Sequence, residues 1–185
     1  MKKVPTLFER DWEGDRSRVL NVINPACQWV IDGEGVATHK LDGMCAAILG
    51  DPYKRREIKK GKEWPNNFVL CETDETTGKS VGYVPIGDGP EDKYFREALA
   101  AKTEWPIGTY ELVGPKSQGG VEGYEIHQLI AHKDPCLIFD DQPPRAFEPL
   151  REWLKGKDIE GIVWHHADGR MAKIKKKDFG LSRND

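Results

Sequence analysis

The fold is best predicted from Val36-Ala37-Thr38-His39-Lys40-Leu41-Asp42-Gly43, an apolar run that ends in a lysine and a turn. The run predicts a strand that ends at Lys40, and Asp42-Gly43 predicts a turn directly after it. Side chains alternate along an extended chain, so Lys40 and Asp42 are expected on the same side. The glycine would let another backbone or a ligand approach closely. Lys40 is therefore a candidate nucleophile; the alternative is a solvated lysine beside a surface turn.

A second informative stretch lies near the end of the chain and contains Asp168-Gly169, a strong signal for a two-residue hairpin loop. With this loop, Ala167 faces Arg170 and the pairing continues along both strands. One face of the hairpin then carries a carboxylate and two lysines; its members are Glu160, Ile162, Trp164, Lys173 and Lys175. The other face is apolar and is expected to enter the core; its members are Val163, Ala172 and Ile174. A polar surface hairpin would explain the charges but not this apolar face.

Short apolar segments between glycines and prolines predict many strands and few helices. Strands are expected at Cys27–Ile31, Val36–Lys40, Met44–Leu49, Phe68–Glu72, Ser80–Ile86, Gly108–Gly114 and Tyr124–His132. Helices are expected at Glu91–Lys102 and Phe147–Lys155. Residues 1–24 fit either a helix or two short pieces, and Pro52–Pro65 fits a basic loop or an irregular strand. The pattern predicts one α+β domain over residues 1–185, built on antiparallel sheet.

The composition is that of a polar domain without a membrane span. Of the 185 residues, 38% are hydrophobic and 32% are charged, and no apolar run is long enough to cross a bilayer. The N-terminus has no apolar segment of the kind found in signal peptides, so a cytoplasmic (intracellular) location and no membrane partner are expected. The net charge of -3 argues against a protein held on nucleic acid by bulk electrostatics.

Charge and cysteines are distributed unevenly. Basic clusters at Lys54–Lys62 and Lys173–Lys177 could contact phosphates, although charge runs are more often solvated faces. The four cysteines form no Cys-x-x-Cys pair and have no histidine at zinc-ligand spacing; they are Cys27, Cys45, Cys71 and Cys136. They are expected to be reduced, mostly buried thiols.

Five stretches, in this order, resemble motifs I, Ia, III, IV and V of the covalent nucleotidyltransferases, the superfamily of ATP- and NAD-dependent ligases and mRNA capping enzymes. They are Lys40–Gly43, Tyr53–Arg56, Tyr110–Gly114, Glu160–Val163 and Lys173–Lys175. Within the superfamily the chain is most similar to the small 5′-to-3′ RNA ligases of vertebrates and bacteria. That similarity covers most of the chain from about Val36 and includes Gly82–Pro85, His127–His132 and Phe179–Leu181. It implies a nucleotidyltransferase (ATP-grasp-like) domain of antiparallel sheets flanked by helices, without an accessory OB domain.

The resemblance implies an ATP-dependent RNA ligase that acts in RNA repair. Lys40 would attack the α-phosphate of ATP to form lysyl-AMP, the AMP would pass to an RNA 5′-phosphate, and a 3′-hydroxyl would displace it. An ordinary lysine is protonated at neutral pH, so neighbouring cations or desolvation must activate it. The implied cofactors are ATP and Mg²⁺, or Mn²⁺ in its place, and the implied partners are RNA ends.

The same resemblance assigns roles to other residues. Glu111 would hold the ribose or a metal-bound water, and Glu160 would orient the Mg²⁺ shell, so both are candidate metal ligands. Arg55 would clamp phosphate or ribose with Lys54 or Arg56. Lys173 and Lys175 would neutralise charge on the transferring phosphate. The implied nucleotide-binding set is His39, Asp42, Arg55, Glu111, His127, Glu160, Lys173 and Lys175.

Two histidines depart from the family pattern. His39 stands where many relatives have a glutamate that reads the adenine amino group, which leaves base choice open. His127 stands where an aromatic residue stacks on the base; the alternative is an ordinary half-buried strand histidine. Other functions remain open: a DNA nick ligase, a capping guanylyltransferase, or a catalytically silent nucleotide- or RNA-binding module. The natural RNA, any template requirement and the oligomeric state are not indicated by the sequence.

Overall fold

The computed structural model describes residues 1–185, which divide into two compact units. The first, which we call the Asp42 unit, comprises Met1–Lys3 and Asp42–Asp134. The second, the Lys40 unit, comprises Val4–Leu41 and Pro135–Asp185. Antiparallel strands dominate both units and helices are few, which confirms the predicted α+β class. No helix combines the length and the apolar character needed to cross a membrane.

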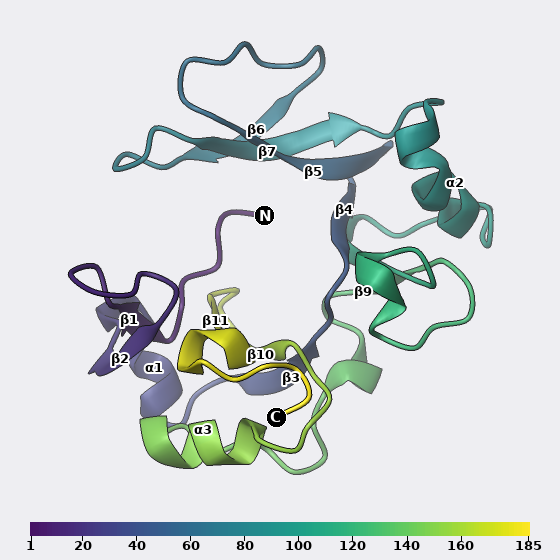
Figure 1. Cartoon of the computed structure of the whole chain (residues 1–185). Helices are drawn as coiled ribbons and strands as arrows, with labels where there is room; N and C mark the ends of the chain where they lie inside the picture. The colour runs from purple at the N-terminus through teal and green to yellow at the C-terminus, as the bar shows by residue number, and fades with distance from the viewer. The chain divides into compact units, whose positions relative to one another are not determined.

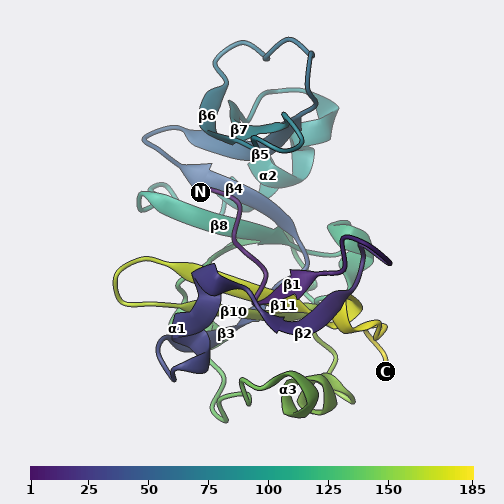
Figure 2. The same ribbon diagram turned by 90° about the vertical axis from the view of Figure 1, so that its left-hand side faces the viewer.

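The Lys40 unit is built on a three-stranded antiparallel sheet in the order β11–β10–β3 (Figures 1 and 2). These strands are β3 (Val36–Lys40), β10 (Gly161–His165) and β11 (Met171–Lys175). A segment near the start of the chain runs parallel to β11: the Lys173 N–H donates to Pro5 O at 2.9 Å, and the Leu7 N–H donates to Lys173 O at 2.8 Å. The predicted strand that ends at Lys40 is confirmed, and its partner is β10.

The β10–β11 hairpin has a longer loop than predicted. The His166 N–H donates to Arg170 O at 2.9 Å, so these two residues form the last pair before the loop. The Gly169 N–H donates back to His166 O at 3.0 Å, and Gly169 has φ 96°, a left-handed conformation that favours glycine. Ala167, Asp168 and Gly169 together therefore form a three-residue loop.

The longer loop shifts the predicted strand register by one residue. Val163 opposes Lys173, and Gly161 opposes Lys175, so the predicted Trp164–Lys173 and Ile162–Lys175 pairs are wrong. The shift moves side chains to opposite faces of the sheet. The fully buried residues of the hairpin are Ile162, Trp164, Ala172 and Ile174. The core positions predicted for Ala172 and Ile174 are confirmed, whereas Val163 lies on the lysine face.

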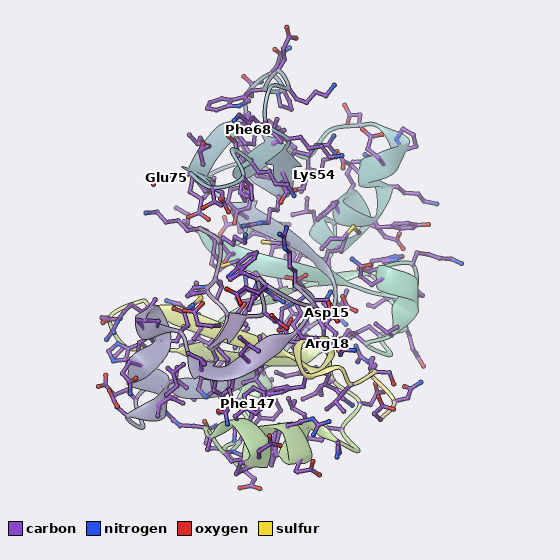
Figure 3. The ribbon with its side chains drawn as sticks, turned by 60° about the vertical axis from the view of Figure 1, so that its left-hand side comes forward. Asp15, Arg18, Lys54, Phe68, Glu75 and Phe147 are labelled. Carbon is purple, nitrogen blue, oxygen red and sulfur yellow. The ribbon has the colours of Figure 1, made fainter.

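The remaining elements of the Lys40 unit complete its core. They are β1 (Phe8–Arg10), β2 (Val19–Ile23), η1 (Pro25–Cys27), α1 (Gln28–Ile31), η4 (Pro135–Leu137), α3 (Phe147–Leu154) and η5 (Lys176–Phe179). The predicted helix after the Pro143-Pro144 break is confirmed as α3, which lies along the sheet in both ribbon views (Figures 1 and 2). Phe147, at its start (Figure 3), packs edge-on against Phe8 and Phe179, with ring centroids 5.0 Å apart in each pair.

Residues 19–31 show why local pattern alone misleads. β1 and β2 confirm two short pieces within residues 1–24, but the strand predicted at Cys27–Ile31 is wrong, because this segment is helical. The Asn24 side chain accepts a hydrogen bond from the Ala26 N–H at 3.0 Å, and Pro25 follows it at the first position of η1. Both features favour a helix start. Trp29 and Val30 are buried on this helix, which satisfies the apolar run that suggested a strand.

The Asp42 unit contains a six-stranded antiparallel sheet in the order β6–β7–β5–β4–β8–β9. Its strands are β4 (Met44–Ile48), β5 (Pro52–Ile58), β6 (Val69–Thr73), β7 (Ser80–Pro85), β8 (Gly108–Val113) and β9 (Gln128–Ala131). The strands predicted at β4, β6, β7 and β8 are confirmed. The one predicted at Tyr124–His132 is shorter, and the first part of Pro52–Pro65 is a regular strand.

One face of this sheet is covered by α2 (Lys93–Leu99), which follows η2 (Pro90–Asp92) and lies beside β9 (Figure 1). A further short helix, η3, spans Gln118–Gly120. The core formed by α2 and the sheet contains Ala46, Ile48, Phe95, Ala98, Tyr110, Leu112 and Leu129. Lys54, labelled in Figure 3, leaves β5 and forms an ion pair with the buried Asp92 carboxylate. Because alternate residues of β4 and β8 enter this core, the residues between them lie on the opposite face.

Candidate functional site

Three lysines of the Lys40 unit share the sheet face opposite its core. Gly161 of β10 is paired with Lys40 of β3 on one side and with Lys175 of β11 on the other. A side chain at Gly161 would not fit, since its Cβ would lie 2.1 Å from the Ile174 carbonyl oxygen. The glycine therefore lets the three strands pack closely with both lysines beside it. The predicted gathering of lysines on one face is confirmed, although by a different register.

Glu160 lies between two of these ammonium groups. It immediately precedes β10, and its carbonyl oxygen accepts the Lys176 N–H at 2.9 Å. Its Oε2 is 2.5 Å from Lys40 Nζ, and its Oε1 pairs with Lys175 Nζ. Burial alone would raise the pKa of the Glu160 carboxyl, but the charges of Lys40 and Lys175 outweigh burial and lower that pKa. Glu160 is therefore an anion that holds both ammonium groups.

Lys173 is the third lysine on this face, opposite Val163. Burial lowers the pKa of Lys173 to about 8, and the positive charges of Lys175 and Lys40 add to the effect. Lys173 therefore loses its proton more readily than an ordinary lysine does. A nearby anion would stabilise its charged form. The cluster of Lys40, Lys173, Lys175 and Glu160, which we call the lysine cluster, is therefore suited to phosphate groups.

His39 lies on the other face of β3 from Lys40. It is paired with Ile162, whose side chain is buried, and its ring centroid is 6.3 Å from that of Phe139. Thr38, next to it, returns to the lysine face, where its hydroxyl donates to Val163 O at 3.1 Å and lies 3.1 Å from His165 Nε2. The structure therefore does not bring His39 into the lysine cluster. Its predicted contact with the base stays a prediction.

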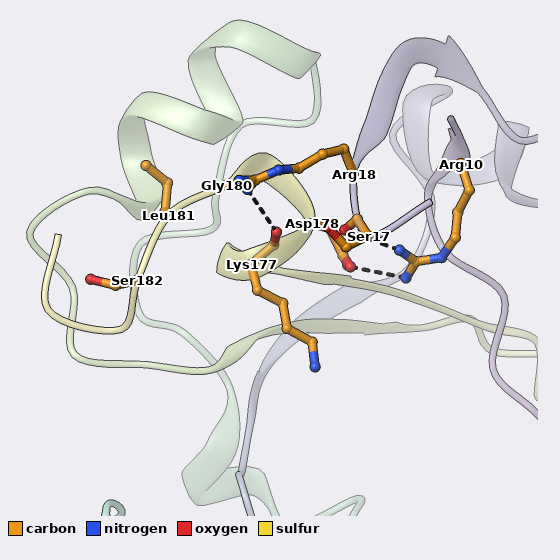
Figure 4. Close-up of a pocket in the computed structure, with 8 residues that line it drawn as sticks. All are labelled: Arg10, Ser17, Arg18, Lys177, Asp178, Gly180, Leu181 and Ser182. Carbon is orange, nitrogen blue, oxygen red and sulfur yellow. Dashed lines mark hydrogen bonds and ion pairs between the residues drawn. The ribbon is translucent and has the colours of Figure 1, made fainter. Parts of the chain in front are cut away.

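The basic run at Lys173–Lys177 divides among three environments. Lys173 and Lys175 belong to the lysine cluster, whereas Lys176 is fully buried and donates to the carbonyls of Lys157, Arg183 and Asp185 at 2.7–2.9 Å. Lys177 lines a pocket of about 580 Å³ together with Arg10 and Arg18 (Figure 4). Arg10 forms an ion pair with the buried Asp178 at 2.9 Å in this pocket. The run is therefore not simply a solvated face.

The Asp42 unit contains a second polar cluster, which the sequence did not indicate. Glu111 of β8 lies directly opposite Cys45 of β4, and His132 follows β9. His132 Nε2 is 2.8 Å from Glu111 Oε2, and its Nδ1 is 2.9 Å from Thr109 Oγ1. We call Cys45, Glu111 and His132 the Cys–Glu–His cluster. Only Glu111 was a predicted site residue; the strand pairing would have had to be known to find the other two.

None of the four cysteines forms a disulfide, as predicted. Cys27 is buried, Cys45 and Cys71 are partly buried, and Cys136 is exposed, so the prediction of mostly buried thiols is wrong for Cys136. Burial raises the pKa of the Cys45 thiol to about 11, and the negative charge of Glu111 contributes in the same direction. Its Sγ lies 3.8 Å from the Tyr83 hydroxyl.

Two other predicted nucleotide-binding residues belong to the Asp42 unit. Arg55 of β5 lies opposite Tyr83 of β7, and its guanidinium donates to Met1 O at 2.7 Å. The Asp42 N–H donates to the Glu122 carboxylate at 2.8 Å. Gly43 makes the close approach that the sequence predicted, because a Cβ there would lie 2.3 Å from Leu112 O.

His127 has protein partners on both ring nitrogens. The Lys116 N–H donates to its Nε2 at 3.2 Å, so Nδ1 carries the proton that faces the Glu97 carboxylate at 3.2 Å. The ring is buried and stacks on Tyr94, with centroids 4.2 Å apart. These contacts favour the alternative of an ordinary structural histidine, although His127 is buried rather than half-buried and directly precedes β9. Base stacking by His127 stays a prediction.

The comparisons with known proteins all show similarity to one family. The family model described as RNA ligase 1 matches residues 95–185. Proteins named RNA ligase 1 from Pongo abelii, Danio rerio and Rattus norvegicus are 33%, 32% and 32% identical to this chain over 81, 82 and 81 residues, respectively. Each match covers 40% of this chain and 24% of the relative, so the chain spans about a quarter of the relatives' length. The resemblance to RNA ligases that the motifs predict is confirmed. Glu111, Glu160, Lys173 and Lys175 lie within the family match, and Lys40 lies before it.

Proposed function

We propose that this chain, which is similar to RNA ligase 1 over residues 95–185, is an ATP-dependent RNA ligase that carries AMP on Lys40. The observation that supports this most directly is the lysine cluster: Lys40 and Lys175 both contact Glu160 on one sheet face. A chain that only bound RNA would need cations, but not a carboxylate that holds the lysine of the Lys-x-Asp-Gly motif.

The proposed first step forms one bond and breaks another at the α-phosphorus of ATP. Lys40 Nζ attacks the phosphorus, a phosphorus–nitrogen bond forms, and pyrophosphate leaves. In the structure Lys40 is held in an ion pair, so it must leave Glu160 and release a proton to water before it can attack. Lys173 and Lys175 then face the transferring phosphate and stabilise its charge.

Glu160 is also the residue on this face that fits a metal ion. Mg²⁺ prefers oxygen ligands and is commonly held by one or two carboxylates together with substrate phosphates. Glu160 provides such a carboxylate, and its lowered pKa keeps that group ionised. When bound, the ion would supply charge neutralisation at the phosphates. In the later proposed steps AMP passes from Lys40 to an RNA 5′-phosphate, and a 3′-hydroxyl attacks that phosphate and releases AMP.

Covalent labelling tests the proposal. Purified protein is incubated with Mg²⁺ and α-labelled ATP or GTP, then denatured, beside Lys40→Ala and Lys155→Ala. Lys155 is a suitable control because its ammonium pairs with Glu152 on an exposed helix end, 2.7 Å away. We expect label from ATP on the wild type and on Lys155→Ala, and none on Lys40→Ala. Joining of a 5′-phosphorylated RNA to a 3′-hydroxyl RNA should follow the same pattern.

Three outcomes would contradict the proposal in whole or in part. Label from GTP instead of ATP would favour a capping guanylyltransferase. Wild-type protein that has been shown to carry no AMP beforehand, yet takes no label, would leave a silent binding module as the better interpretation. A label on the wild type with sealing of nicked DNA, but not of RNA, would keep the lysine chemistry and change the substrate.

A further inference from the structure

The Cys–Glu–His cluster is assembled by strand pairing rather than by sequence spacing. Cys45 and Glu111 are direct partners across β4 and β8, so their side chains leave the sheet on the same face. The His132 N–H donates to Thr109 O at 3.1 Å, which continues the β8–β9 pairing by one step. His132 therefore lies opposite Thr109 and diagonal to Glu111. Three donor side chains converge on one face within the Asp42 unit.

The donor atoms are close enough to share one ion. The Cys45 sulfur, a Glu111 carboxylate oxygen and a His132 ring nitrogen all lie within 4.8 Å of one another. The ligand atoms of a tetrahedral zinc ion are roughly 3–4 Å apart, given zinc–sulfur and zinc–nitrogen bonds of about 2.3 and 2.0 Å. Small side-chain rotations would therefore complete the geometry without moving a strand.

His132 is also oriented as metal-binding histidines are. Its Nδ1 is 2.9 Å from the Thr109 hydroxyl, while its Nε2 points to Glu111 at 2.8 Å. A hydrogen bond to the non-coordinating ring nitrogen fixes the tautomer and the ring direction at metal sites. The Thr109 hydroxyl would hold Nδ1 while Nε2 binds the ion. Thr109 is therefore a positioning residue.

The ligand types select the ion. A thiolate, an imidazole and a carboxylate together suit Zn²⁺, whereas Mg²⁺ and Ca²⁺ require oxygen ligands. The two negative charges of a Cys45 thiolate and a Glu111 carboxylate would balance the charge of Zn²⁺. The set is partly buried, with the Glu111 and His132 side chains 11% and 21% exposed. Three protein ligands leave a fourth position for water or a substrate group.

We propose that Cys45, Glu111 and His132 form a zinc-binding site in the Asp42 unit. None of the residues of the lysine cluster is a member of this set. It does not require the chain to be a ligase, because metal binding is measured without ATP or RNA. Glu111 would be common to zinc binding and to the predicted ribose contact.

The test is a titration of the whole chain with metal ion. Zn²⁺ binding is followed by competition with a chromophoric chelator, and Co²⁺ binding is followed by absorption, since a thiolate–cobalt bond gives an ultraviolet charge-transfer band. We expect one Zn²⁺ per chain and a cobalt band on the wild type. Cys45→Ser and His132→Asn should bind zinc at least 100-fold more weakly, and Cys45→Ser should lose the band. Thr109→Val should weaken binding about tenfold, because it removes only the orienting hydrogen bond.

Cys71→Ser is the matched control. Cys71 lies on β6 of the same sheet and is also partly buried, but it is not a member of the cluster. Its substitution should leave both the affinity and the cobalt band unchanged. Circular dichroism establishes that each variant is folded, and Cys45→Ala replaces Cys45→Ser if the latter is not. Equal zinc affinity in the wild type and both ligand variants, or a cobalt spectrum without a thiolate band, would overturn the proposal.

Discussion

The two units of the chain build their polar clusters by the same structural device and reach opposite chemistry. In each, an antiparallel sheet buries one face and presents alternate side chains on the other. In the Lys40 unit, the Glu160 carboxylate pairs with the ammonium groups of Lys40 and Lys175, and Lys173 lies on the same sheet face. The Asp42 unit gathers a thiol and an imidazole around the carboxylate of Glu111. Sheet register therefore determines which residues meet, and residue type determines whether the face is suited to phosphate groups or to a metal ion.

Glycine has the same role in both places. Gly161 lies between Lys40 and Lys175, and Gly43 lies against Leu112 O and the Glu111 side chain. At either position a Cβ would meet backbone within 2.3 Å. The difference is that Gly161 keeps three strands together around an existing ion-pair network, whereas Gly43 permits the approach of a strand that positions a single carboxylate.

The largest effect is expected from Glu160→Gln in the Lys40 unit. The substitution removes the anion between two ammonium groups and leaves three lysines that repel one another. Loss of one preorganised charge typically lowers such rates about 10²–10³-fold, and breaking a buried ion pair costs about 3–5 kcal/mol. Both are measured on the same preparation, by the rate of ATP labelling and by denaturant unfolding.

Glu152→Gln is the control for that change, since Glu152 is 59% exposed and pairs only with Lys155. This substitution should change neither the rate of ATP labelling nor the free energy of unfolding measurably. Glu160→Asp, which keeps the charge, serves if the glutamine variant does not fold. Labelling of Glu160→Gln at the wild-type rate would show that the reaction of Lys40 with ATP does not depend on the Glu160 carboxylate. The two units would then differ in which residues their clusters contain, but not in a need for a central carboxylate.

A smaller effect is expected from Gly43→Ala in the Asp42 unit. The added methyl group would lie 2.3 Å from Leu112 O and 2.7 Å from Glu111 Cγ, so β8 and the Glu111 side chain must shift. Overpacking of this kind costs about 1–3 kcal/mol. If Glu111 is a zinc ligand, zinc affinity should fall about tenfold as well, and the chelator competition measures it.

Gly87→Ala is the matched control in the same unit. Its Cβ would meet no atom closer than 3.7 Å, from the Asp92 carboxylate. It should leave zinc affinity unchanged. Unaltered affinity in Gly43→Ala, with the expected loss of stability, would indicate that the backbone contact is structural and that Glu111 is not held by it.

The sequence predicted the lysine cluster better than the Cys–Glu–His cluster for a physical reason. Lys40, Glu160, Lys173 and Lys175 all fall in short motifs, and Lys173 and Lys175 share a face by alternation whatever the length of the hairpin loop. Glu160, which precedes β10, joins them through its ion pairs with Lys40 and Lys175. Distinguishing a two-residue loop from a three-residue loop required knowing that His166 pairs with Arg170. Cys45 and His132 are far apart in sequence, and only the order β4–β8–β9 brings them together. The strand prediction at Cys27–Ile31 was wrong because an apolar run of this length fits either a strand or a helix. The Asn24 cap and Pro25 at the first helical position favour the helix.

The smallest effect, and the most specific to the Lys40 unit, concerns Lys173. Its folded-state pKa of about 8 is below its ordinary value of 10.5, because burial and the charges of Lys175 and Lys40 disfavour the ammonium form. Below about pH 8 Lys173 is protonated in both the folded and the unfolded protein. The folded protein is then destabilised by the full cost of keeping this ammonium group buried beside two other positive charges. Between about pH 8 and 10.5 the folded protein releases the proton while the unfolded chain keeps it, so stability rises with pH. Lys173→Met removes this dependence.

We therefore expect Lys173→Met to be more stable than the wild type at pH 7, on the order of 1–3 kcal/mol, with the difference shrinking towards pH 10. Denaturant unfolding of both proteins at a series of pH values measures it. Lys155→Met, at an exposed lysine, should show no such trend relative to the wild type. A stability difference that stays constant with pH would mean that Lys173 differs from methionine only in packing. A difference that shrinks as expected would show that burial and the charges of Lys175 and Lys40 destabilise the ammonium form of Lys173 in the folded protein.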